Sequence, residues 1–79
     1  MTKFPRDAPI AKVLKALGAL GFEVIREGNH ISLSRINADG SRTPLTMPNH
    51  KEIKSPTLLL ILRQAGITRD EFIEVFNKL

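Results

Sequence analysis

One histidine near the middle of the chain is the best candidate for acid–base chemistry. His30 lies in the stretch GNHISLSR, residues 28–35, where apolar and polar side chains alternate as in a half-buried strand. Ile31 and Leu33 would point toward a core, and His30 would point the other way. Imidazole titrates near neutral pH, so an exposed His30 could accept and release a proton during a reaction.

Basic residues around this histidine could complete a site for a phosphodiester. Cleavage of RNA needs a proton removed from a 2′-hydroxyl and positive charge near the non-bridging oxygens. Arg26, Arg35, Arg42 or Lys51 could supply that charge if the fold brings them close to His30. The alternative is that His30 is a polar residue of an exposed strand without a chemical role, because lone histidines are common.

Other catalytic centres are not indicated. The second histidine, His50, follows Pro48 in a loop and is more simply explained as a turn residue. The sequence has no cysteine, no glycine-rich phosphate loop and no zinc-ligand spacing, so we expect neither a metal nor a cofactor. With four phenylalanines and no tyrosine or tryptophan, a platform of aromatic rings for stacking bases is not expected either.

The elements that position His30 follow from the hydrophobic periodicity. Asp7 is the expected N-cap of the first helix, and Ser55 and Thr68 are the expected N-caps of the last two. Pro44 indicates an edge strand or a late start to the pairing. The predicted elements are a helix over 8–20, strands over 22–26, 30–36 and 42–47, a loop over 47–54, and helices that follow Ser55 and Thr68.

This order, α-β-β-β-α-α, predicts one α+β domain over residues 1–79. A three-stranded antiparallel sheet would carry its helices on one face and leave the other face open to water or a partner. His30 belongs on the open face by alternation. Twelve Lys and Arg against eight Asp and Glu give a net charge of +4, which favours a polyanionic partner but is also ordinary for a soluble surface. No apolar run is long enough to cross a bilayer, and a cytoplasmic location is expected.

Two segments of the chain together resemble the HicA family of toxins. LGALGFEVIREGNH is similar to the family's L-x-x-x-G-F-x-x-x-R-x-x-G-S-H. DGSRTPLTMPNHKEIKSPTLLLILRQAGI is similar to its D-G-x-x-x-x-x-x-P-x-H-x-x-E-[LI]-x-x-G-T-L-x-x-I-L-x-x-A-G-I. The ordered set covers nearly the whole chain.

The resemblance implies a fold like the double-stranded RNA-binding domain and an mRNA interferase of a toxin–antitoxin pair. It implies that His30 is the catalytic histidine of a metal-independent endoribonuclease, that Gly28 is the turn glycine before it, and that a HicB-type antitoxin covers the active face. With Gly28 and Asn29 in the turn, Arg26, Arg35, Lys51 and Lys54 are then the candidates for binding RNA phosphates.

The sequence departs from the family pattern in three places. Asn29 stands where serine is usual, although asparagine tolerates a left-handed turn. Pro56 replaces a glycine at a helix start. Leu59 and Leu60 occupy positions that are often polar or basic, and they could either bind a partner or pack against the last helix. The alternative function is therefore a non-catalytic RNA-binding or antitoxin-docking module of the same fold.

Overall fold

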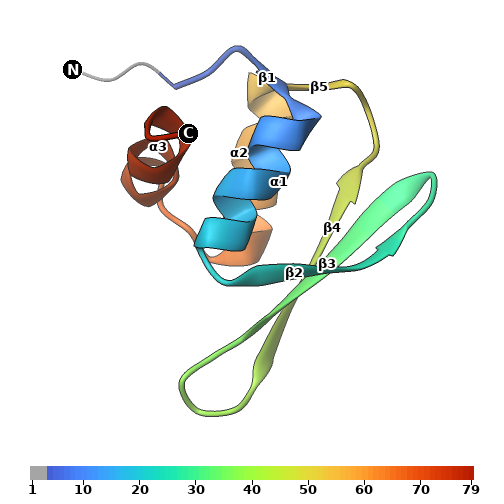
Figure 1. Ribbon diagram of the computed structural model, residues 1–79, viewed down its shortest axis with the longest axis vertical. Helices are drawn as coiled ribbons and strands as arrows, with labels where there is room; N and C mark the ends of the chain where they lie inside the picture. The colour runs from blue at the N-terminus through green and yellow to red at the C-terminus, as the bar shows by residue number, and fades with distance from the viewer. Residues whose placement is uncertain (1–3) are drawn as a thin grey trace.

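A three-stranded antiparallel sheet and three helices make up most of the fold. The computed structural model describes residues 4–79 (Figure 1). The elements in chain order are β1 (Asp7–Pro9), α1 (Ile10–Ala19), β2 (Phe22–Glu27), β3 (His30–Ile36), β4 (Arg42–Pro48), β5 (Glu52–Lys54), α2 (Ser55–Ala65) and α3 (Arg69–Asn77). The large sheet has the order β2-β3-β4, so the predicted α+β class and meander are confirmed.

The helices cover one face of the large sheet. Alternation along β3 and β4 buries Ile31, Leu33, Leu45 and Met47 against them. Helix α1 packs near β2 and α2 near β4, while α3 lies mainly against α1 (Figure 1). The core is continuous from the sheet to Phe72 of α3, whose ring stacks on a second phenylalanine of the same helix. None of the helices formed within residues 4–79 lies on the opposite face of the sheet.

A second, two-stranded sheet was not expected from the sequence. Strand β1 pairs with β5 in antiparallel register, with Asp7 opposite Lys54. The prediction that Asp7 caps the first helix is therefore wrong, because Pro9 occupies the cap position and the Asp7 carboxylate lies 3.9 Å from Lys54 Nζ. Each strand has only three residues and one buried side chain, too few for an alternating pattern to be recognised.

The helix ends follow the sequence signals more closely. Gly66 takes φ +71° directly after α2, the left-handed conformation that glycine adopts without steric cost. Thr68 and Glu71 form the expected capping box at the start of α3, and these hydrogen bonds to Thr68 hold the pKa of Glu71 below its ordinary value. Ser55 is wrong as an N-cap, because it is already the first residue of α2 and no side chain caps that helix.

The outer edge of β4 has no free N–H from Pro44 to Pro48. Pro44 and Pro48 lack a backbone N–H, and the N–H of Thr46 between them donates to Gln64 Oε1 of α2 at 3.3 Å. In an antiparallel ladder, every second residue of a strand turns its backbone groups away from the partner strand. The bond from Thr46 to Gln64 shows that Thr46 is such a residue, and Pro44 and Pro48, two positions to either side, are therefore also turned away from β3. The prediction that Pro44 marks an edge strand is confirmed.

Candidate active site on the open sheet face

The open face is the side of the large sheet that the helices leave uncovered. Register places its residues in rows across the three strands: His30 lies opposite Pro48, and Ser32 lies between Arg26 and Thr46. The next row contains Glu23, Ser34 and Pro44, and the last pairs Ile36 with Arg42. All of these side chains are exposed or half-buried. The open face therefore carries hydroxyls and charged groups together with two prolines and an exposed isoleucine, and a histidine lies at one end.

His30 is exposed at the first position of β3, as alternation predicted. A short turn holds it there, because the N–H of Gly28 donates to the carbonyl oxygen of His30 at 3.1 Å. The loop after β4 braces this turn from outside: Asn49 Nδ2 donates to the Gly28 carbonyl at 2.8 Å, and the Asn49 N–H donates to the Asn29 carbonyl at 3.3 Å. Sequence reasoning missed Asn49, whose only signal was a turn-forming residue after a proline.

Replacing Asn49 with alanine should loosen the turn that carries His30. We expect the free energy of unfolding to fall by about 1 kcal/mol, the usual net contribution of one hydrogen bond. Amide hydrogen exchange at Gly28 should become several-fold faster. The matched control is Asn37→Ala, which removes bonds to Ser41 and Thr43 at the other hairpin and should leave Gly28 unchanged. Equal rates of amide hydrogen exchange at Gly28 in the two variants would show that the Asn49 side chain does not stabilise the turn.

The turn does not use left-handed backbone. Positive φ occurs within residues 4–79 only at Gly21, Gly40 and Gly66, so Gly28 and Asn29 have ordinary conformations. A Cβ added to Gly28 would meet only the His30 carbonyl oxygen, at 3.9 Å, which is normal van der Waals contact. The expected tolerance of Asn29 for a left-handed turn is therefore not needed, and asparagine fits here as serine would.

Arg26 is the basic residue closest to His30 in the sheet. It lies opposite Ser32 on β2, one diagonal step from His30, and diagonal neighbours in a sheet are about 7–8 Å apart. Lys51 is exposed in the loop that begins with Asn49. Lys54 lies beyond it in β5, where its ammonium is 3.9 Å from the Asp7 carboxylate. An exposed ion pair of this kind contributes little to stability, so Lys54 is available to other anions.

Arg35 lies on the other face, and the expectation that it stands beside His30 is wrong. It is opposite Phe22 and Thr43, in the row between those that contain Ser34 and Ile36. Its guanidinium lies over the Phe22 ring, 5.0 Å from the centroid, and Nη2 donates to the Ala65 carbonyl at 3.4 Å. Arg35 lies five positions after His30, an odd offset that places it on the opposite face of the strand, where it stabilises the packing of β2 and α2.

Leu59 and Leu60 are not buried under the last helix. Their side chains are 38% and 59% exposed, whereas their neighbours Leu58 and Ile61 are buried. Gln64, one helical turn after Leu60, reaches the outer edge of β4, so Leu60 lies on the same side of α2. Leu59 lines a shallow pocket with Arg63 and residues of the loop before α3. The pair is an apolar surface beside the sheet rather than part of the core.

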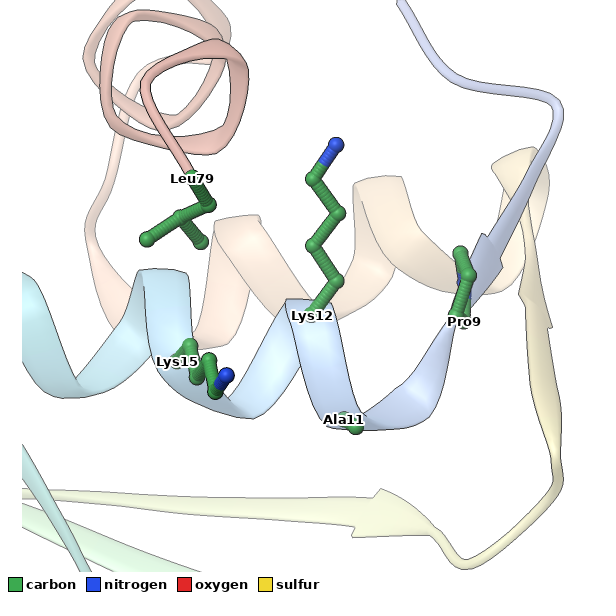
Figure 2. A pocket seen from close by; sticks show the side chains of 5 residues that line it. All are labelled: Pro9, Ala11, Lys12, Lys15 and Leu79. Atoms are coloured by element: carbon green, nitrogen blue, oxygen red, sulfur yellow. The ribbon is translucent and has the colours of Figure 1, made fainter.

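A second hollow lies along α1, away from His30. Figure 2 shows Lys12 and Lys15 projecting from the helix beside Pro9, Ala11 and Leu79. The ammonium of Lys12 lies 4.2 Å from the centre of a phenylalanine ring of α3. This hollow offers positive charge and apolar walls but no side chain that exchanges protons near neutral pH. It therefore does not compete with His30 as a catalytic centre.

The part of the chain that the structure describes contains no cluster of three or more His, Cys, Asp or Glu side chains able to hold a metal ion. No helix within residues 4–79 is long and apolar enough to span a bilayer. The chemistry available on the open face is thus that of one imidazole, several hydroxyls and nearby cationic groups.

Comparison with known families identifies the class. A family model described as "HicA toxin of bacterial toxin-antitoxin" matches residues 10–67, which includes the whole large sheet and α2. The chain belongs to the HicA toxin family, and it is the toxin of a pair that also has an antitoxin. The searches of curated proteins and of solved structures returned no match. The resemblance drawn from the sequence is confirmed.

Proposed function

We propose that this toxin is a metal-independent endoribonuclease that cleaves mRNA in the cytoplasm. His30 acts as the general base that takes the proton of the 2′-hydroxyl, and the oxygen then attacks the adjacent phosphorus in line. The 5′-oxygen of the next nucleotide leaves, which yields a 2′,3′-cyclic phosphate. The observation that carries the proposal is the exposed position of His30 on the open face, accessible to a strand of RNA.

Cationic side chains of β2 and of the segment after β4 are the candidates for binding the RNA phosphates. Arg26 is its diagonal neighbour on β2, and Lys51 and Lys54 follow it along the segment beyond β4. We assign to them the phosphates on either side of the scissile bond. Gly28 and Asn29 form the turn next to the base, and the exposed side chain of Asn29 is the part of the turn that a nucleotide would meet, because the carbonyl groups of both residues and the N–H of Gly28 are already bonded within the protein. Arg35 receives no such role, because its guanidinium is engaged on the helix side.

The antitoxin partner is proposed to be of the HicB type and to cover the open face. Leu59 and Leu60 extend that surface from the β4 edge along α2. Exposed leucines of this kind are suited to burial under a protein partner, and they give RNA no charge or hydrogen bond. One antitoxin molecule that rests on both regions would block the access of RNA to His30.

An RNA-cleavage assay in the presence of a chelator tests the activity. Purified protein should cut a long mRNA without added metal, and the products should carry 2′,3′-cyclic phosphate ends. Cleavage should be inhibited by excess antitoxin. Binding that weakens steeply with salt while the RNA remains intact would instead indicate a non-catalytic RNA-binding module. Products with 3′-hydroxyl ends would contradict attack by the 2′-oxygen.

A further inference from the structure

At the end of the open face away from His30, an arginine and a serine side chain lie together and could bind an anion. Arg42, the first residue of β4, directs its guanidinium along the sheet rather than away from it, and Nη1 donates to Ser34 Oγ at 3.2 Å. Ser34 and His30 lie four residues apart on β3, about 13 Å at roughly 3.3 Å per residue. Arg42 therefore cannot touch the phosphate on which His30 would act.

The guanidinium and the hydroxyl are both available to a ligand. Neither of the two ion pairs formed within residues 4–79 includes Arg42, so its charge is not neutralised. Ser34 accepts the bond from Arg42, and its own O–H proton is directed to no acceptor in this part of the chain. An arginine fork beside a hydroxyl donor matches the oxygens of a phosphate group.

The surroundings determine on which side such a phosphate would lie. Ser34 has Pro44 opposite it on β4 and Glu23 opposite it on β2. The Glu23 carboxylate repels an anion, whereas Pro44 presents an uncharged surface next to Arg42. The favourable path from His30 therefore follows the β4 half of the open face, past Thr46 and Pro44 to Arg42.

We propose that Arg42 and Ser34 form a second phosphate subsite, which binds the backbone of the RNA strand several nucleotides from the cleaved bond. This inference rests on the proposed nuclease function. At about 3.4 Å per stacked nucleotide, 13 Å corresponds to about four nucleotides, or to about two if the strand is extended. The substrate is then a single-stranded segment that spans the open face, and shorter fragments are bound less tightly.

Oligonucleotides with one cleavable linkage test the subsite. Each contains a single ribonucleotide, with each of the four bases in turn, and 2′-O-methyl nucleotides elsewhere, so only one position has the attacking hydroxyl. The chain is lengthened by one to six nucleotides, separately on the 5′ and 3′ sides. For the wild type, kcat/KM should rise on one side once about two to four nucleotides are added.

Arg42→Gln should lower kcat/KM for the lengthened substrates about tenfold, while kcat/KM for the shortest substrate stays unchanged. Ser34→Ala should remove a smaller part, and Glu23→Gln should increase the rise. Arg63→Gln, which removes an exposed arginine of α2, is the matched control and should behave as the wild type. The same length dependence in the Arg42 variant and the wild type would overturn the subsite.

A binding experiment separates this inference from the nuclease proposal. Fluorescence anisotropy with a fully 2′-O-methylated oligonucleotide of the greatest length requires no cleavage. Arg42→Gln should weaken binding about tenfold and reduce the slope of log affinity against log salt by about 0.7, the loss of one phosphate contact. Equal binding by the variant and the wild type overturns the subsite. If the wild type binds the oligonucleotide in an Arg42-dependent way but cleaves no RNA, the subsite is supported and the nuclease proposal is refuted.

Discussion

Replacing His30 with alanine should abolish detectable RNA cleavage, with a fall in rate of about 10²–10⁴-fold. That is the range that a positioned general base contributes, and His30 is the one histidine among the open-face residues that the register places there. Growth arrest on expression should disappear with it. Because the imidazole is exposed, its removal should leave the circular dichroism spectrum and the melting temperature almost unchanged.

His50→Ala is the matched control for this variant. It removes the same side chain from an exposed position in the loop after β4, two residues beyond Pro48. Cleavage should persist, because we assign no step of the reaction to His50. The pair therefore distinguishes loss of a catalytic group from loss of any exposed imidazole. Cleavage retained by the His30 variant would remove that residue from the mechanism, whatever happens to the control.

Leu58→Ala should destabilise the fold by about 2–5 kcal/mol, the range for truncation of a buried leucine. The side chain is completely buried in α2, between the sheet and the rest of the core. A domain of this size has about 4–12 kcal/mol of stability in total, at 0.05–0.15 kcal/mol per residue. Chemical denaturation followed by circular dichroism should therefore show a large shift of the midpoint, and much of the protein could be unfolded at growth temperature.

Leu60→Ala makes the same chemical change two residues further along the same helix. Its side chain is 59% exposed, so the unfolding free energy should change by less than about 0.5 kcal/mol. Affinity for the antitoxin should fall instead, because the proposed contact surface is lost. If the two variants are destabilised equally, the burial assigned to α2 is wrong. If Leu60→Ala binds antitoxin as the wild type does, the apolar surface is not part of that contact.

Much of this fold follows from local sequence signals. The change of period from helix to strand at Phe22, the alternation through β3 and the capping box at Thr68 each depend on a few adjacent residues. The burial of Leu33 and the exposure of His30 then follow together from one alternation. These are the features on which the placement of the proposed catalytic group depends.

Contacts between distant segments could not be predicted in the same way. The pairing of β1 with β5 joins segments more than forty residues apart, and each strand is too short to show a pattern. The Asn49 side chain donates to the backbone carbonyl of Gly28, and a carbonyl is present at every position, so the sequence does not reveal this partner. Arg35 was assigned by its charge type alone, although its position in the alternation already placed it on the helix side. In the absence of coordinates, charge type is a weak guide to which cations share a surface.

The outer edge of β4 has a consequence for this molecule once it is free of its partner. Growth of sheets into a filament requires that both edge strands of every molecule can pair with a neighbouring molecule. Here the prolines and the Gln64 side chain leave the β4 margin of the large sheet without a free N–H from Pro44 to Pro48. Addition of a strand is therefore favoured at the β2 margin, and pairing through that margin alone stops at two molecules rather than growing into a filament.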